Sequence, residues 1–207
     1  MVIRTRAGDV TFGEFMEIVR EDQKADLIDG VIYMASPENI EHNDVIGWLV
    51  AIIRPFVDHR RLGKVTVNRV AYRLTNKNAP EPDVAVILSK RLGDVRRGYV
   101  AGPPDLAIEV VSPESVHRDY ELKRRRYEKS GVQEYWIIDP DERQATFFCL
   151  GEEGFIEQQP EKKVFHSRVL PGLAVDVRWF WQRPLPDTLA IVQSLVGRTR
   201  KQPRSNP

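Results

Sequence analysis

The sequence predicts an α/β fold whose core runs helix, strand, strand, strand, helix, strand. Three observations support this order. Residues 37–55 carry apolar side chains at helical spacing, so one face of this segment should be buried. Residues 105–111 are rich in β-branched side chains, as a buried central strand is. Residues 117–130 have a helical pattern, and Gly131 is suited to end that helix.

A short helix and a hairpin precede this core. Thr11 and Glu14 have the spacing of a capping box, which predicts the start of a helix over residues 11–22. Residues 25–36 contain two short apolar strands on either side of the dipeptide Asp-Gly at 29–30. This dipeptide favours a two-residue hairpin turn.

The long helix and the strands after it follow from proline positions and alternation. Ser36 and Pro37 should start the helix, because proline suits a first helical turn, and Pro55 should kink or end it. Residues 64–74 alternate as one long strand with a register change that fits a β-bulge. A short apolar run at residues 84–88 predicts the next strand.

Further strands and a last helix are predicted at residues 132–139, 144–150, 154–159 and 179–195. The length suits one domain, which we place at residues 1–196. Residues 197–207 have no apolar content to bury, and we expect them to form a basic disordered tail.

Charge and composition restrict the function. The chain has 31 Lys and Arg against 30 Asp and Glu, so it lacks the basic excess of a dedicated duplex-DNA binder. No run of about 18 apolar residues is present to span a bilayer, and the N-terminus has no apolar segment typical of a secretory signal. The single cysteine, Cys149, excludes an internal disulfide and a multi-cysteine zinc site, and we interpret it as a small buried hydrophobe. We expect a cytoplasmic protein without a membrane partner.

Glu109 is unusual because it lies in the middle of the apolar strand AIEVV. A carboxylate buried there costs several kcal/mol unless a positive charge neutralises it. That charge can be a Lys or Arg partner or a divalent metal. A salt-bridged or edge-of-sheet glutamate is the purely structural alternative.

Asp83 is the second candidate acid. It begins a strand directly after Pro82. If strands 83–88 and 105–111 pair, Asp83 and Glu109 converge at one edge of the sheet. Two carboxylates joined by a backbone carbonyl and waters suit Mg²⁺ or Mn²⁺.

Lys123 is the third candidate. It shares a helix face with Tyr120 and Tyr127, at spacings of three and four, and this aromatic face should turn toward the sheet. An inward lysine needs an anion, such as Glu109, a phosphate or a metal hydroxide. The alternative is a surface ion pair with Asp119, four residues earlier.

Several segments resemble the Uma-two family, a bacterial group classed with the endonucleases of the PD-(D/E)XK superfamily. They are PEPDVAVIL, PPDLAIEVVSPES and RDYELKRRRYEKSGVQEYWIIDP. The resemblance extends upstream through DLIDGVIYMASP and His42, and covers roughly residues 10–150. It implies a restriction-endonuclease-like core with a mixed sheet, to which the N-terminal helix and hairpin and the C-terminal strands are additions.

The resemblance also implies roles for individual residues. Asp83 and Glu109 would be the two acids of the motif and hold the metal, with the Val110 carbonyl as a further ligand. The usual lysine, two residues after the glutamate, is replaced by Val111. In the family a lysine from the following helix substitutes for it, and Lys123 occupies that position.

Two more residues match family positions. Asp26 stands where the family commonly has glutamate, so it is a candidate accessory acid in the metal shell, with a hairpin-edge residue as the favoured alternative. His42 matches a frequent family histidine. It is a candidate for substrate contact or proton transfer, and equally for a plain polar residue at a helix N-terminus.

The function implied is a Mg²⁺- or Mn²⁺-dependent endonuclease that hydrolyses DNA phosphodiester bonds. The alternative is a catalytically weak or inactive relative that binds nucleic acid or a protein partner, which the near-zero net charge and Val111 favour. A nucleophilic serine site and a GxxxxGK[ST] phosphate loop are both missing from the sequence. A homodimer through residues 144–180 is a further prediction, because TFFCL and RWFW are apolar, although core packing explains them as well.

Overall fold

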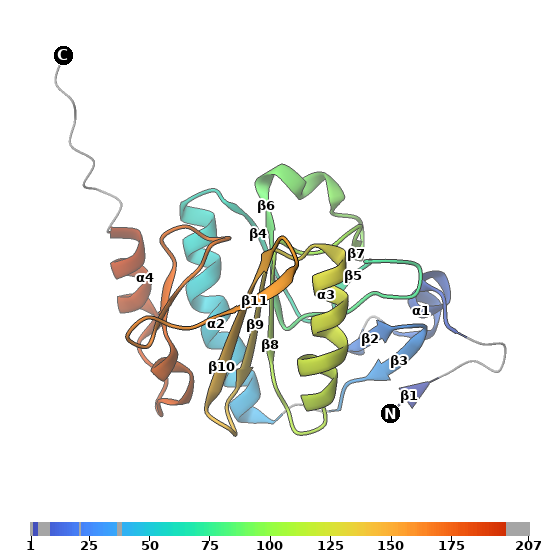
Figure 1. Cartoon of the computed structure of the whole chain (residues 1–207), viewed down its shortest axis with the longest axis horizontal. Helices are drawn as coiled ribbons and strands as arrows, with labels where there is room; N and C mark the ends of the chain where they lie inside the picture. The colour runs from blue at the N-terminus through green and yellow to red at the C-terminus, as the bar shows by residue number, and fades with distance from the viewer. Residues whose placement is uncertain (1, 4–8, 21, 37–38, 198–207) are drawn as a thin grey trace, which may run out of the picture.

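The computed structural model describes residues 2–3, 9–20, 22–36 and 39–197, and its centre is a six-stranded mixed sheet (Figure 1). The strand order is β11-β10-β9-β8-β6-β4. In this sheet β8 and β9 are parallel and the other neighbouring pairs are antiparallel. The six strands are β4 (Gly63–Val67), β6 (Val84–Leu88), β8 (Leu106–Val110), β9 (Glu134–Asp139), β10 (Gln144–Gly151) and β11 (Gly154–Gln158).

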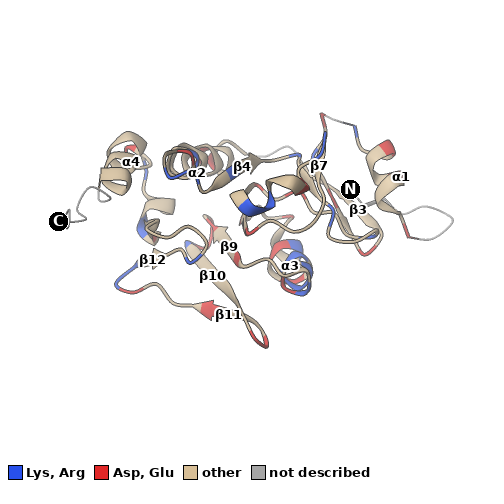
Figure 2. Ribbon diagram, turned by 90° about the horizontal axis from the view of Figure 1, so that it is seen from above, with Lys and Arg blue, Asp and Glu red and all other residues tan. Residues whose placement is uncertain are grey.

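Helices cover both faces of this sheet (Figure 1, Figure 2). The long helix α2 (Ile40–His59) packs on one face, with α4 (Thr188–Gly197) beside it, and α3 (Arg124–Ser130) lies on the other. The chain order from α2 through β4, β6, β8 and α3 to β9 is the predicted helix-strand-strand-strand-helix-strand core. The α/β prediction is therefore confirmed.

Alternation along β8 decides which side chains reach each face. Ile108 and Val110 join the main core cluster with α2, whereas Ala107 packs in a second cluster with Tyr127 of α3. Successive strand residues point to opposite faces, so Glu109 lies on the α3 side with Ala107.

The N-terminal helix and hairpin form a separate small unit beside the sheet (Figure 1). Helix α1 (Phe12–Ile18) begins with the predicted capping box. Strand β3 (Val31–Met34) pairs with β2 (Ala25–Ile28) on one side and β1 (Val2–Ile3) on the other. The predicted turn is confirmed, because Asp29 and Gly30 have φ angles of 51° and 73°.

Short elements complete the fold. Strand β5 (Ala71–Tyr72) pairs in parallel with β7 (Tyr99–Val100), and β12 (Val164–His166) pairs with β13 (Ala174–Asp176) in antiparallel orientation. Two 3₁₀ helices span Ser89–Asp94 and Val177–Trp181, and a π-helical segment, Arg118–Lys123, leads into α3.

The prediction of one strand over residues 64–74 is wrong. The chain leaves the large sheet after β4, and β5 belongs to a different sheet. Asn68 and Arg69, at φ 39° and 40°, turn the backbone into the left-handed region between the two strands. Two short strands joined by this turn replace the predicted bulge.

The predicted helix boundaries also need correction. The first helix ends at Ile18 rather than near residue 22. Helix α2 begins at Ile40, where the Asn39 side chain accepts a 2.7 Å hydrogen bond from the His42 N–H, and Pro37 lies outside the described residues. The helix also does not end at Pro55, because the buried face continues beyond it through Phe56 and Val57.

The C-terminal apolar residues contribute to the core. Phe147, Cys149 and Phe180 are each at most 2% exposed, so packing within the chain accounts for them and the homodimer stays a prediction. The tail prediction falls almost wholly on residues 198–207, outside the described part of the chain. None of the described helices is both long and apolar enough to cross a membrane.

The core packing predicts that replacing two different isoleucines by alanine lowers the free energy of unfolding by very different amounts. Ile108 is fully buried in β8, and Ile156 is 55% exposed on the edge strand β11. Ile108→Ala should lower the free energy of unfolding by about 2–5 kcal/mol, because it removes buried methyl groups and leaves a cavity. The control Ile156→Ala should cost less than about 1 kcal/mol. Urea unfolding followed by circular dichroism measures both, and similar losses would contradict this core.

Candidate active site

Two buried carboxylates face each other on neighbouring strands. Strands β6 and β8 pair with Val84 opposite Ile108, and the same register puts Asp83 opposite Glu109. The Val110 N–H donates a 2.7 Å hydrogen bond to Asp83 Oδ2. Both carboxylates line one pocket, and each residue is at most 2% exposed. The predicted pairing of these strands is confirmed, and it brings the two acids together.

Lys24 neutralises Asp83 from the N-terminal hairpin. Its amine forms an ion pair with Asp83 Oδ1, although Lys24 precedes β2 and is 59 residues away in sequence. Burial lowers the pKa of Lys24, but the Asp83 and Glu109 carboxylates together outweigh this effect, and the pKa lies above its ordinary value. Lys24 therefore carries a positive charge in this pocket.

Both carboxylate oxygens of Glu109 have a partner in the pocket. Its Oε2 lies 2.9 Å from Lys123 Nζ, and its Oε1 accepts a 2.8 Å hydrogen bond from the Tyr127 hydroxyl. Burial raises the pKa of Glu109 to about 8, against the opposing effect of the Lys123 ammonium. Nearby positive charge therefore favours the ionised form of this carboxylate, and a bound cation would favour it further.

Lys123 sits among three carboxylates. Its Nζ is 2.9 Å from Glu109 Oε2, 3.1 Å from Asp26 Oδ2 and 3.3 Å from Asp119 Oδ1. Lys123 points inward as its spacing from the tyrosines predicted, and the ion pair with Asp119 also forms, but it is buried rather than on the surface. Burial lowers the pKa of Lys123, whereas the three acids raise it by more, so its pKa stays above the ordinary value.

The π-helical segment explains how this helix supplies several groups at once. Arg118, Asp119 and Lys123 all lie within it, and π turns are frequent at functional sites. Arg118 Nε lies 3.1 Å from Asp26 Oδ2, so the segment reaches the hairpin as well as the sheet.

Asp26 lies on β2, an edge strand of the hairpin sheet, and its buried carboxylate contacts the charged residues Lys123 and Arg118 of the pocket. It is 3% exposed, and its Oδ1 accepts a 2.8 Å hydrogen bond from the Glu81 N–H. In return, Glu81 Oε2 accepts a 3.1 Å bond from the Ala25 N–H. These two bonds fasten β2 to the segment that leads into Asp83.

His42 reaches the same place from the first turn of α2. Its Nε2 lies 2.6 Å from the Val110 carbonyl oxygen and 3.8 Å from Asp83 Oδ2, and the residue is 5% exposed. His42 is thus a polar residue near a helix N-terminus, and its side chain is buried. Its ring is buried against the carbonyl predicted as a metal ligand.

The oxygen atoms of this pocket are of the types that hard divalent ions prefer as ligands. They are the Asp83 and Glu109 carboxylates and the Val110 carbonyl, and carboxylates keep lone pairs beyond the contacts named above. Within the described ranges, no three His, Cys, Asp or Glu side chains form a metal cluster, so the backbone carbonyl would have to complete the set. The pocket has about 20 Å³ of space, roughly the room of one water molecule.

The charges also leave room for a cation. With every group in its charged form, four carboxylates, Asp26, Asp83, Glu109 and Asp119, meet three cations, Lys24, Arg118 and Lys123. The formal net charge of this cluster is then −1. A divalent ion would therefore not bind against an existing positive excess.

Sequence reasoning missed Lys24, Arg118 and Tyr127 and assigned Asp119 only to the surface. A signal existed for Lys24, because it stands two residues before Asp26 and alternation puts both on one face of a strand. Sequence periodicity assumes 3.6 residues per helical turn, so it could not reveal the π turn that brings Arg118 inward.

The comparisons with known proteins identify the family. Residues 12–178 match the model of the Uma2 (Uma-two) family, described as "Putative restriction endonuclease", and the chain belongs to this family. A solved structure, "a putative nuclease belonging to DUF820" from Anabaena variabilis ATCC 29413, is similar with a TM-score of 0.69 at 20% sequence identity. The similarity covers 83% of this chain and 97% of that one, and it supports the restriction-endonuclease-like fold. No curated protein matches the chain.

The charge network predicts that Lys123 has a large effect on stability. Lys123→Met should lower the free energy of unfolding by roughly 3–5 kcal/mol, because three buried carboxylates lose their shared cation. The control Arg125→Met removes an exposed ion pair with Glu121 on the same helix and should cost less than about 0.5 kcal/mol. Urea unfolding at pH 7 compares them. Equal losses of unfolding free energy in the two variants would contradict the ion pairs of Lys123 with the three buried carboxylates.

Proposed function

We propose that this chain is a metal-dependent endonuclease that hydrolyses DNA phosphodiester bonds. The observation that carries the proposal is the buried pair of acids, Asp83 opposite Glu109, with the Val110 carbonyl beside them. The Uma2 family and the nuclease-like fold support hydrolysis of nucleic acid in general. The metal and the preference for DNA are part of the proposal.

Asp83, Glu109 and the Val110 carbonyl would hold Mg²⁺ or Mn²⁺. When bound, such an ion polarises the phosphate and lowers the pKa of a bound water. Lys123 holds Glu109 in place and offers positive charge next to it for the developing negative charge on phosphate. Because the acids raise the pKa of Lys123, its ammonium suits charge stabilisation and water orientation better than proton removal.

His42 and Asp26 have supporting roles in this proposal. His42 contacts the Val110 carbonyl oxygen and therefore positions a predicted ligand. Asp26 contacts Lys123 and Arg118 and so sets the direction of the lysine amine. Neither role requires contact with the reacting atoms.

The second candidate is a nuclease-fold protein with little or no activity that binds nucleic acid or a protein partner. Two observations favour it. Lys24 and Lys123 already neutralise Asp83 and Glu109, and Val111, at the position of the usual lysine, is buried in apolar contacts. A chain of this kind would bind its partner with or without a divalent ion.

The proposal predicts metal-dependent cleavage that needs both acids. Purified protein should cut labelled DNA oligonucleotides or plasmid with Mg²⁺ or Mn²⁺ and stop on addition of EDTA. Glu109→Gln and Asp83→Asn should each lower the rate by about a hundredfold or more, since even outer-shell partners of a metal typically contribute 10- to 100-fold.

Glu153→Gln is the matched control, because Glu153 is an exposed acid in the β10–β11 turn, and it should keep the wild-type rate. Cleavage that survives in both site variants would reject these residues as the active site. Complete inactivity of the wild-type chain with either metal would favour the binding protein instead.

Metal binding should also be visible without any substrate. An ion that binds only the folded chain stabilises it by about 2.7 kcal/mol at a hundredfold excess over its Kd. We expect Mn²⁺ to raise the Tm of the wild-type chain and of Glu153→Gln, measured by differential scanning calorimetry. Asp83→Asn should lose this increase, and an equal increase in Asp83→Asn would place the ion elsewhere.

A further inference from the structure

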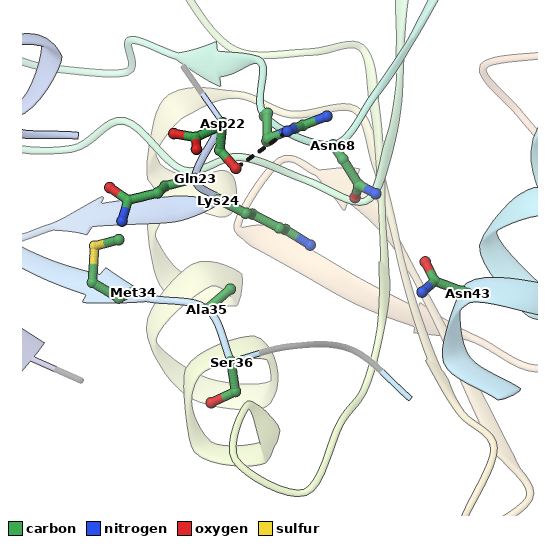
Figure 3. Close-up of a pocket in the computed structure, with 9 residues that line it drawn as sticks. Asp22, Gln23, Lys24, Met34, Ala35, Ser36, Asn43 and Asn68 are labelled. Carbon is green, nitrogen blue, oxygen red and sulfur yellow. Dashed lines mark hydrogen bonds between the residues drawn. The ribbon is translucent and has the colours of Figure 1, made fainter. Parts of the chain in front are cut away.

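A larger pocket opens directly beside the acidic site (Figure 3). Its volume is about 390 Å³, within the range of small-molecule sites, roughly 300–1,000 Å³. It shares Lys24, Ala35 and Ser36 with the acidic pocket, so the two are adjacent. The residues that line it are Asp22, Gln23, Lys24, Met34, Ala35, Ser36, Asn43, Asn68 and Arg69.

The lining of this pocket suits a neutral polar group rather than an anion. Three side-chain amides, Gln23, Asn43 and Asn68, offer both donors and acceptors. Lys24 is already paired with the Asp83 carboxylate. Arg69 donates to the neutral Asp22 carbonyl oxygen at 3.2 Å and keeps its charge, but it also lines the next pocket. The amide part of the lining therefore suits a neutral group, and Arg69 is available to a phosphate of the same ligand.

Asn68 is the most informative of the three amides. Its Oδ1 is buried and has no hydrogen-bond partner within the described part of the chain. In Figure 3 the polar ends of Lys24, Asn43 and Asn68 point toward a common space. Because Oδ1 is buried, we expect a ligand in the pocket to contact Asn68 through the N–H groups of the amide, which act as donors.

The backbone at Asn68 is held in an uncommon conformation next to the acidic site. Asn68 and Arg69 both have left-handed φ angles, 39° and 40°, which are uncommon outside glycine. The Asn68 N–H donates to the Asp83 carbonyl oxygen at 3.0 Å. The same residue that lines the larger pocket is therefore fixed to one of the two acids.

We propose that this pocket is a subsite for the base of the nucleotide next to the scissile phosphate. Side-chain amides match the donor and acceptor edges of nucleobases. A base can enter only if it is unpaired, because in a duplex its edge is bonded to the opposite strand and its faces are stacked. This proposal rests on the proposed nuclease function and narrows its substrate to nucleic acid that is single-stranded or opened at the cut.

The surface beyond the pocket is consistent with a single strand that continues past this base. A further pocket of about 560 Å³ shares Gln23 and Arg69 with the first and adds Arg20 and Arg97. Positive side chains along a groove follow the phosphates of a single strand. The acidic pocket, the base subsite and this arginine-lined pocket therefore lie next to one another, because neighbouring pockets share lining residues.

The test compares a fluorescent single-stranded oligonucleotide with the same sugar–phosphate chain lacking bases. Wild-type protein with Mn²⁺ should cut the normal strand about tenfold faster, in kcat/KM, than the chain without bases or a fully paired duplex. Asn43→Ala and Asn68→Gly should lower cleavage of the normal strand by about tenfold; glycine adopts the φ of 39° at position 68 without strain. They should not lower cleavage of the chain without bases, because that chain already lacks the contact that each substitution removes.

Asn76→Ala, an exposed asparagine in a loop away from the pocket, is the matched control and should behave as wild type. Equal rates on the strands with and without bases, or variants that slow cleavage of both substrates equally, would contradict the proposed subsite.

Binding of the same strands, measured by fluorescence anisotropy with Ca²⁺, separates failure of the subsite from failure of the nuclease proposal. Binding that depends on the bases and on Asn43, without any cleavage, would reject the nuclease and keep the subsite. Absence of both binding and cleavage would reject the subsite. Equal affinity for strands with and without bases, unchanged by Asn43→Ala, would also reject it.

Discussion

The burial of charge is the constraint on which the site depends. Asp83 and Glu109 are almost fully buried, and a buried carboxylate is tolerated only when positive charge and hydrogen bonds compensate its lost hydration. Lys24 and Lys123 supply that charge in this chain. The hairpin brings Lys24 to Asp83, 59 residues away in sequence, and the helical segment that follows β8 brings Lys123 back to Glu109.

Different parts of the fold supply the residues of the site. The antiparallel register of β6 and β8 sets the acids opposite each other. The N-terminal hairpin provides Lys24 and Asp26, the π-helical segment provides Lys123, and the first turn of α2 provides His42. The hairpin, which is an addition to the common core, is therefore part of the site.

Much of the core could be predicted from the sequence, because its signals are local. The β-branched run around Glu109 predicted the central strand, and the spacing from Tyr127 predicted that Lys123 points inward. The break at Asn68 was missed because residues 64–74 alternate without a glycine or proline. The Lys24–Asp83 contact was missed because it joins two residues that only the tertiary structure brings together.

The proposed function requires one divalent ion to bind between Asp83 and Glu109. Diffraction data collected at the manganese absorption edge, from crystals grown with Mn²⁺, would locate this ion. We expect an anomalous peak within about 2.5 Å of an oxygen of each carboxylate and of the Val110 carbonyl. No peak there at saturating Mn²⁺, with Lys24 and Lys123 still holding the two acids, would contradict it.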